Sequence, residues 1–265
     1  MSAEYEVFAV KYGAHTGRPM SINFIDGDPH DTSGVLAFYV WLIRGHGRTI
    51  LVDTGMTKES AASRGRTMDR LPREGLEALG ISPREVQDVV VTHLHFDHAG
   101  TLGDWENARF HLQDEEMACA TGRLMCHDRL RHPYDVEDVC TMVRKVYKDE
   151  VCFHCGDAEI APGISVHHIG GHAKGLMSVR VNTRRGHVVL ASDAAHLYAN
   201  MEQQRPFPIL YNLGDMLEGW RKLSRLADSP GHIVPGHDPL VMQRYRPAQP
   251  GMEDLAVRLD EMPSG

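Results

Sequence analysis

The sequence contains no apolar run long enough to cross a lipid bilayer, so it predicts no transmembrane helix. Its first residues are acidic and are not followed by the basic and apolar regions of a signal peptide. Basic residues are in the minority, with 28 Lys and Arg against 36 Asp and Glu. Because nucleic-acid binding depends on clustered basic side chains, this balance argues against such a partner. We therefore expect a cytoplasmic protein that binds neither membranes nor nucleic acid.

Cysteines are few, and their pattern predicts no disulfide framework. The five are odd in number, as is common in a reducing compartment: Cys119, Cys126, Cys140, Cys152 and Cys155. Cys152 and Cys155 have the spacing of a zinc knuckle, but no second pair lies near them in the sequence. We interpret them as free thiols, with a structural metal site or a local disulfide as the alternatives.

Histidines, in contrast, are abundant, and several are clustered behind one apolar run. Val89–Val91 predicts a buried strand, and His93, His95, Asp97 and His98 follow within a few residues. Residues 93, 95 and 97 share one parity and residue 98 has the other, so a tight loop at the strand end can direct them toward two neighbouring ions. Imidazole and carboxylate are suitable ligands for zinc and other borderline divalent ions. This stretch predicts a metal site.

Four more potential ligands each follow an apolar run that predicts a strand. They are Asp53, His172, Asp193 and His237. Open α/β sheets place their binding sites at the carboxyl ends of strands. One aspartate at a strand end is more often a turn former, but the four together with the first cluster indicate two sets of ligands.

Apolar periodicity elsewhere predicts a single α/β domain over residues 1–265. Strands are expected at 5–12, 35–44, 49–53, 89–91, 109–112, 164–169, 176–181, 188–191 and 231–237. Helices are expected at 73–79, from 82, in two pieces over 113–147 broken near 132–133, at 213–226, and as a short helix after 247. We expect a long loop at 13–34 and a largely helical cover over the site at 113–160.

The order of the polar motifs resembles the metallo-β-lactamase superfamily. The motifs are His-x-His-x-Asp-His at 93–98, Gly-His-x-x-Gly at 171–175, Ser-Asp at 192–193 and Gly-His at 236–237. The resemblance implies an αββα sandwich, in which two mixed β-sheets pack face to face with helices outside. It also implies two metal ions per chain, the first held by His93, His95 and His172, the second by Asp97, His98 and His237, with Asp193 bridging both and Asp53 orienting a ligand histidine.

Such a centre favours hydrolysis. Two metal ions about 3.5–4 Å apart can hold a shared water as hydroxide near neutral pH and polarise a carbonyl for its attack. Asp97 and Asp193 are then candidate catalytic carboxylates. Zinc is the expected ion because neutral imidazoles predominate, with iron, manganese or cobalt as alternatives. A non-haem iron oxidoreductase is a second hypothesis, although the di-iron redox branch of the superfamily typically has glutamate where this sequence has His95, which counts against it. A metal-binding module without turnover is a third hypothesis.

Within the superfamily the chain resembles the N-acyl homoserine lactonases in the stretch His-Leu-His-Phe-Asp-His-Ala-Gly and in Pro-Gly-His-Asp near its end. This implies a small lactone as substrate, a quorum-quenching role, and a homodimer as one arrangement. Lactonases of this type carry a tyrosine three residues after the bridging aspartate, where this chain has His196; the nearest tyrosine is Tyr198. His196 either donates a hydrogen bond to a developing oxyanion or packs as a structural residue. Tyr198 and Phe207 are candidates for the pocket wall, and another cyclic ester, a cyclic amide or a thioester is the alternative substrate.

Overall fold

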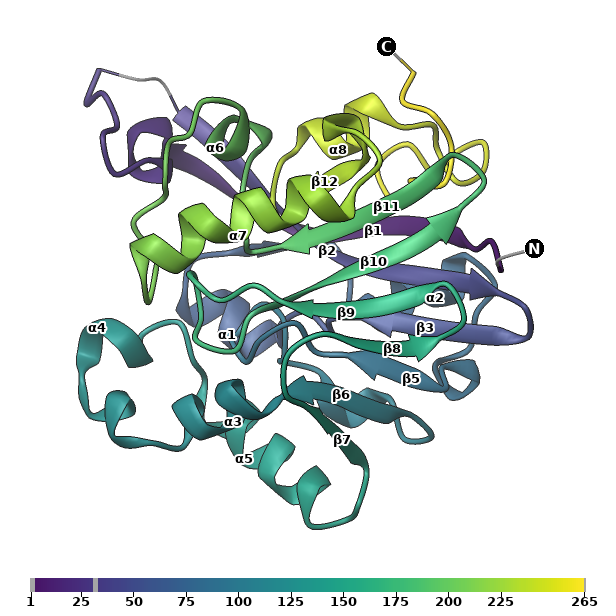
Figure 1. Cartoon of the computed structure of the whole chain (residues 1–265), viewed down its shortest axis with the longest axis horizontal. Helices are drawn as coiled ribbons and strands as arrows, with labels where there is room; N and C mark the ends of the chain where they lie inside the picture. The colour runs from purple at the N-terminus through teal and green to yellow at the C-terminus, as the bar shows by residue number, and fades with distance from the viewer. Residues whose placement is uncertain (1–2, 31–32, 265) are drawn as a thin grey trace.

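The computed structural model describes residues 3–30 and 33–264. The first two residues of the acidic N-terminus and residues 31–32 of the expected loop lie outside the described residues. The strands form two mixed sheets (Figure 1). The larger has the order β13-β1-β2-β3-β5-β6-β7, with β4 paired to β1. Its strands are β1 Glu6–Pro19, β2 Ser33–Gly45, β3 Arg48–Val52, β4 Thr67–Met68, β5 Asp88–Val90, β6 Arg109–Gln113, β7 Val151–His154 and β13 Ala256–Arg258.

The smaller sheet has the order β12-β11-β10-β9-β8. Its strands are β8 Ala158–Ala161, β9 Ile164–His168, β10 Met177–Thr183, β11 Gly186–Ser192 and β12 Ile233–Pro235. Neighbouring strands of this sheet are antiparallel, except that β11 and β12 are parallel. In the larger sheet β3, β5, β6 and β7 run parallel to one another. The two parallel groups matter for the site, because parallel strands bring their carboxyl ends to one edge.

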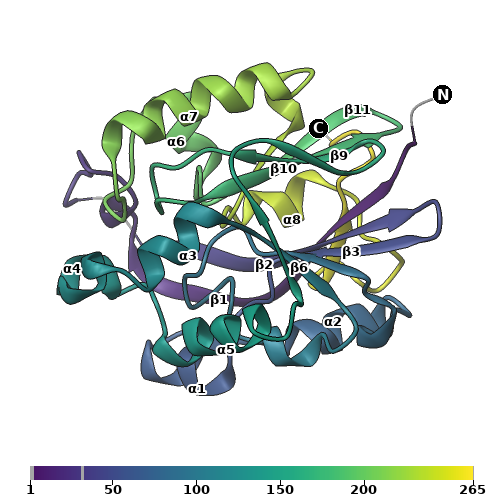
Figure 2. The ribbon, with the colours of Figure 1, turned by 60° about the horizontal axis from the view of Figure 1, so that its bottom comes forward.

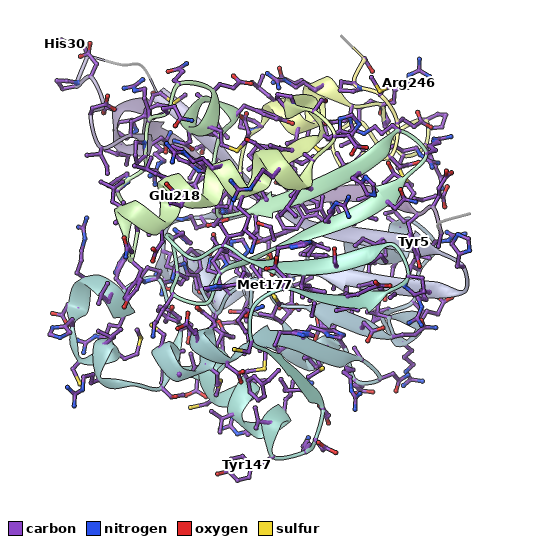
Figure 3. The ribbon with its side chains drawn as sticks, in the orientation of Figure 1. Tyr5, His30, Tyr147, Met177, Glu218 and Arg246 are labelled. Carbon is purple, nitrogen blue, oxygen red and sulfur yellow. The ribbon has the colours of Figure 1, made fainter. Side chains whose placement is uncertain are left out.

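The two sheets share one apolar core, and β2 shows why both of its faces are apolar. Tyr39, Trp41 and Ile43 alternate onto the inner face, where they join Val179 and other residues of the smaller sheet. Phe38, Val40 and Leu42 alternate onto the outer face, beneath helices. Met177, labelled in the middle of Figure 3, is fully buried in the core between the sheets, whereas Tyr147 projects from the surface. This shared core supports the proposal of one domain.

Helices cover both outer faces of the sandwich (Figure 2). They are α1 Lys58–Ser63, α2 Pro72–Ala78, α3 Asp114–Ala120, α4 Asp128–Arg131, α5 Val136–Val146, α6 Tyr198–Glu202, α7 Leu213–Leu226 and α8 Leu240–Arg244. Met216, Trp220 and Leu223 form one apolar stripe of α7 and pack on the smaller sheet. Leu76 of α2 and Met142 of α5 pack on the larger sheet. The predicted αββα sandwich is therefore confirmed. Among the described residues, no helix is long and apolar enough to cross a membrane.

The predicted loop at 13–34 is wrong over its first part. β1 continues to Pro19 and stays paired with β2, with register shifts at two places along the pair. A Cβ on Gly13 would lie 2.4 Å from the carbonyl oxygen of Thr67, so glycine permits the close approach of β4 there. The glycines that suggest a loop therefore belong to a bulged strand.

The segment 113–160 is helical only in part. It begins with α3, a 3-10 turn at Arg123–Cys126, α4 and α5, and it ends in the strands β7 and β8. The break expected near residue 133 is present, since Pro133 has no N–H to continue a helix and Asp135 caps α5.

Two further expected helices are absent or short. Ser82 and Glu85 form the predicted capping box, but the helix is one 3-10 turn, Pro83–Glu85, because the chain becomes extended at Val86 and enters β5. After residue 247 the described chain forms no helix, and β13 pairs with β1 instead.

Candidate metal centre

The predicted ligands meet at one edge of the sandwich because of the strand directions. Asp53 follows β3, and the cluster that begins at His93 follows the parallel neighbour β5. Asp193 and His237 follow the parallel strands β11 and β12 of the other sheet. His172 lies in the connection from β9 to β10. Since β9 and β11 both run antiparallel to β10, all these segments end on the same side.

The backbone at two of these strand ends is left-handed. Asp53 has φ of 62° and Ser192, which precedes Asp193, has φ of 48°. Such values are uncommon for residues with a side chain, and they concentrate at functional sites. The hydroxyl oxygens of Thr92, just after β5, and of Ser192, at the end of β11, lie 2.8 Å apart and link the two sheets at this edge.

Two groups of three buried ligands lie side by side. Each group brings one ligand atom per residue to within 4.8 Å of the others: His93, His95 and His172 in the first, and Asp97, His98 and His237 in the second. Within the first group, Nε2 of His172 lies 2.8 Å from Nδ1 of His95. In the second, Nε2 of His237 lies 3.7 Å from Oδ2 of Asp97.

The carboxylate of Asp193 lies between the two groups. Its Oδ2 is 3.2 Å from Nε2 of His172 in the first group. Its Oδ1 is 3.0 Å from Nε2 of His237 and 3.3 Å from Nε2 of His98 in the second. Asp193 is 2% exposed, so this carboxylate interacts with protein groups rather than with bulk water. One buried side chain therefore reaches both sets of imidazoles.

The donor set fits metal ions. Nε2 of His93, Nε2 of His98 and Oδ1 of Asp193 are buried, and, although Oδ1 lies close to Nε2 of His98 and of His237, none of the three makes a hydrogen bond of good geometry among the described residues. A buried polar atom without a partner costs about 1–3 kcal/mol, so three of them converging on one place is unfavourable in a purely structural cluster. Metal ions held by these atoms would satisfy all three.

Charges within the site are also those of a cation-binding centre. Burial, reinforced by His98, holds the pKa of His93 well below its usual value, and burial with His172 does the same for the pKa of His95. Burial opposes ionisation of Asp193, but the charges of His237 and His98 outweigh it and hold its pKa well below the usual value. For His93, His95 and Asp193 these are the forms that bind metal, neutral imidazoles and an ionised carboxylate. Burial opposes protonation of His98 and His237, but Asp193 outweighs it and raises the pKa of both, so a metal ion at the second group would have to displace those protons.

Hydrogen bonds from the protein fix the orientation of three of these histidines. Nδ1 of His98 lies 2.7 Å from Oδ2 of Asp53, the residue that the resemblance to the superfamily implied would orient a ligand histidine. Nδ1 of His172 donates to a backbone carbonyl at 2.7 Å, and Nδ1 of His237 to another at 2.9 Å. With Nδ1 engaged, each Nε2 is directed into the centre.

Glu116 is a supporting residue that the sequence did not reveal. This fully buried carboxylate on α3 accepts hydrogen bonds from the backbone N–H groups of Leu94 and Gly175, both at 2.9 Å. It also accepts a hydrogen bond from the hydroxyl of Tyr134 at 3.0 Å. Glu116 thus joins the two loops that carry the first histidine group. Its position on a short acidic helix, 22 residues from Leu94, gave no sequence signal.

His196 lies beside Asp193 of the centre, Phe207 packs against His196, and Tyr198 is buried near Asp238. Nε2 of His196 is 3.0 Å from Oδ2 of Asp193, and its ring stacks on Phe207 with centroids 3.7 Å apart. Burial lowers the pKa of His196 to about 3, so it is neutral. Phe207 and Tyr198 are buried, and neither lines the two cavities beside the centre. The structure therefore does not place these two aromatic residues in the pocket wall, because both pack into the interior.

A cavity of about 670 Å³ opens beside His95 and His172. A smaller adjoining cavity of about 50 Å³ is lined by Asp97, Asp193 and His237. Tyr134 and the chain around it line the larger cavity, so part of the segment 113–160 borders the site.

Three arginines also line this pocket, and the sequence did not single them out as a group. Arg18 and Arg66 line both cavities, and Arg64 lines the larger one. Their guanidinium groups donate to neutral acceptors, such as Oδ1 of Asn23 for Arg18 at 2.6 Å. Within the described part of the chain none of the three is paired with a carboxylate. Burial and Arg66 lower the pKa of Arg18 only to about 10, so it is charged at neutral pH.

Two adjoining groups of buried histidines and aspartates at one edge of an αββα sandwich define a metallohydrolase-type centre. The chain belongs to the metallo-beta-lactamase superfamily, whose family model matches residues 34–237.

Similar proteins narrow the relationship. An N-acyl homoserine lactonase of a Bacillus species is 27% identical over 187 residues, which cover 65% of this chain and 69% of that protein. One from Agrobacterium fabrum is 31% identical over 183 residues, covering 60% of this chain and 63% of the other. A crystal structure of a quorum-quenching N-acyl homoserine lactone lactonase has a TM-score of 0.75 at 24% identity, covering 90% of this chain and 94% of that chain. Another structure shows an N-acyl homoserine lactone hydrolase with the product N-hexanoyl-L-homoserine bound at its catalytic metal center. It has a TM-score of 0.76 at 23% identity, covering 93% of this chain and 98% of that chain. The chain is thus a metallo-beta-lactamase-type hydrolase related to N-acyl homoserine lactonases.

Proposed function

We propose that this protein is a dinuclear zinc hydrolase that opens the ring of a small lactone. The observation that carries the proposal is the position of Asp193, whose two carboxylate oxygens reach both histidine groups. The names of the relatives support lactones as the substrate class. A cytoplasmic location and a homodimer stay expectations from the sequence.

The roles of the ligands follow from the two groups. His93, His95 and His172 would hold one ion, Asp97, His98 and His237 the other, and Asp193 both. When bound, two such ions supply Lewis-acid polarisation of a carbonyl and a lowered pKa for water. The preponderance of imidazole over carboxylate favours zinc.

His196 is placed to act on Asp193. Its Nε2 is the nitrogen that faces Oδ2 of Asp193, and its ring stacks on Phe207 while it also lines the smaller cavity. As a neutral imidazole protonated at Nε2, it donates to the carboxylate and fixes its orientation. Asp97 lines the smaller cavity, where its carboxylate is placed to take up a proton and return it to the leaving oxygen.

The arginines favour one kind of lactone. Unpaired guanidinium groups in a pocket raise the local concentration of anions and bind carboxylate or phosphate through paired N–H donors. A cyclic ester that carries a negative charge therefore suits this pocket better than an uncharged acyl homoserine lactone. Hydrolysis of such an anionic lactone is our second candidate activity.

A pH-stat assay of ring opening on the metal-loaded protein tests both candidates. The panel contains uncharged acyl homoserine lactones, lactones bearing a carboxylate or phosphate, cyclic amides and thioesters. Turnover of a lactone supports the proposal, whereas turnover of only amides or thioesters overturns it. Bound iron with redox-dependent colour and no hydrolysis would instead indicate the oxidoreductase branch.

Arg66→Gln separates the two lactone classes. If the substrate is anionic, this change should raise KM roughly 10- to 100-fold, the loss expected for a charged hydrogen bond. Arg73→Gln is the matched control, because Arg73 pairs with Asp104 on the surface away from the cavities. Equal KM values for Arg66→Gln and the control would exclude an anion-binding role.

A further inference from the structure

A second cluster of metal-ligand side chains lies outside the site described above. It consists of His111 on β6 and of Cys152 and His154 on β7, the neighbouring parallel strand (Figure 1). His111 is paired with Cys152 in the register, and His154 lies two residues further along the same strand. Paired positions and alternate residues share one face of a sheet, so all three side chains point the same way. Their ligand atoms lie within 4.8 Å of one another.

This arrangement replaces the pair of cysteines that the sequence suggested. Cys152 and Cys155 are three residues apart, so an extended chain directs them to opposite sides. Cys155 is exposed and does not belong to the cluster. Cys152 instead shares its face with His154, and the third donor comes from a strand 41 residues earlier in the chain.

The hydrogen bonds of His111 leave a lone pair directed into the cluster. Its Nε2 lies 3.1 Å from Oδ1 of Asp88, a carboxylate that accepts the Nε2 proton. Its Nδ1 lies 2.9 Å from Nε2 of His154. A proton on Nε2 leaves Nδ1 of the neutral ring unprotonated, so Nδ1 accepts the Nε2 proton of His154 here, and the same lone pair can bind a metal ion when His154 carries its proton on Nδ1 instead. A carboxylate behind a histidine is the usual partner of a histidine ligand.

The spacing of the two imidazoles matches that in the metal centre. The facing nitrogens of His172 and His95 are 2.8 Å apart, close to the 2.9 Å between those of His111 and His154. His111 is 6% exposed, whereas Cys152 and His154 are half-buried, so an ion can enter from solvent. Burial and the neighbouring His111 lower the pKa of His154, while Asp114 acts in the opposite direction.

We propose that His111, Cys152 and His154 form a separate site for one thiophilic metal ion of the zinc type. Two imidazole nitrogens and one thiolate are ligands that zinc prefers, and they leave a fourth position for water. Binding breaks the S–H bond of Cys152, forms a sulfur–metal bond, and releases the thiol proton to solvent. The ion would tie β7, the edge strand of its sheet, to β6.

Cobalt substitution tests the proposal independently of lactone hydrolysis. A thiolate bound to Co²⁺ gives a strong near-ultraviolet charge-transfer absorption, and no cysteine is among the ligands of the two groups around Asp193. We expect this absorption when Co²⁺ is added to the reduced, metal-depleted full chain. It should be lost in Cys152→Ser and kept in Cys155→Ser, the matched control, and Cys152→Ser should bind one ion fewer.

The outcomes are distinct. Absence of the thiolate absorption in the unaltered protein, or its persistence in Cys152→Ser, would overturn the proposal. His154→Ala provides a second variant, expected to weaken Co²⁺ binding at this site while circular dichroism reports an intact fold. Lactone turnover should be unchanged in Cys152→Ser, because no residue of the main centre belongs to this cluster. If the unaltered protein opens no lactone, that result would count against the proposed function and leave the proposal for His111, Cys152 and His154 unaffected.

Discussion

Oδ2 of Asp53 lies 2.7 Å from Nδ1 of His98, and both residues are almost completely buried. The same carboxylate accepts the backbone N–H of Thr92 through Oδ1 at 2.7 Å and its hydroxyl through Oδ2 at 2.9 Å. Asp53 thus joins the ends of β3 and β5 and fixes the ring of a metal-centre histidine. Its orienting role was expected from the resemblance to the superfamily, and the contact provides its physical basis.

Asp53→Asn should weaken metal binding at the group that contains His98. Asparagine tolerates the left-handed backbone at this position, so the fold is kept, but the negative charge behind the ring is lost. Loss of such a partner typically lowers metal affinity about 10- to 100-fold. Competition with a chromophoric chelator measures the change, and Asp69→Asn, at a surface pair with Lys11, is the control. Equal affinities in the two variants would contradict this role.

Glu116→Gln should destabilise the fold by about 1–3 kcal/mol. The carboxylate accepts the N–H groups of Leu94 and Gly175 through its two oxygens, and an amide would present its own donor to one of them. Urea denaturation measures the free energy of unfolding. Glu115→Gln, next to it on α3 and half exposed, should change it little. A similar loss in both variants would argue against the link between the two loops.

Asp138 should make the stability of the fold depend on pH. Burial, with Asp135 and Glu137, raises its pKa from 3.8 to about 7, although Arg64 acts in the opposite direction. The folded state therefore holds this proton more tightly than the unfolded state does. The resulting stabilisation is complete below about pH 4 and is lost as the pH rises through about 7, on the order of a few kcal/mol.

Asp138→Asn removes this titration. The difference in unfolding free energy between the variant and the unaltered protein should move in favour of the variant as the pH increases through that window. Denaturant titrations at several pH values measure it, with Asp215→Asn, an exposed position on α7, as the control. A difference that does not vary with pH would show that Asp138 has an ordinary pKa.

Sequence patterns predicted most of the sandwich and which histidines and aspartates meet at its edge, because both depend on local signals. Apolar runs marked the strands, and His93, Asp193 and His237 each lie within three residues of the end of such a strand. Glu116 and the pocket arginines were not predicted, since tertiary contacts alone bring them to the site. The pairing of His111 with Cys152 likewise depends on the register of two strands distant in sequence.

Where the structure differs from the sequence-based predictions, tertiary contacts are again the reason. The residues 13–19 have the composition of a loop, but they pair as a bulged strand because β2 and β4 lie alongside. Phe207 and Tyr198 were candidates for the pocket wall, but Phe207 packs in the interior against His196 and Tyr198 is buried near Asp238. Composition does not show which face of a loop becomes buried.

The most direct test of the account is metal content measured together with lactone ring opening, on the protein as purified and on Asp193→Ala. Asp215→Asn, an exposed position on α7, is the control for the loss of one carboxylate. We predict about two zinc ions per chain in the centre around Asp193, in addition to any ion bound by Cys152. We also predict turnover of a lactone that is lost in Asp193→Ala and kept in Asp215→Asn. The proposed function would be contradicted if the centre around Asp193 binds no metal, or if lactone turnover survives in Asp193→Ala.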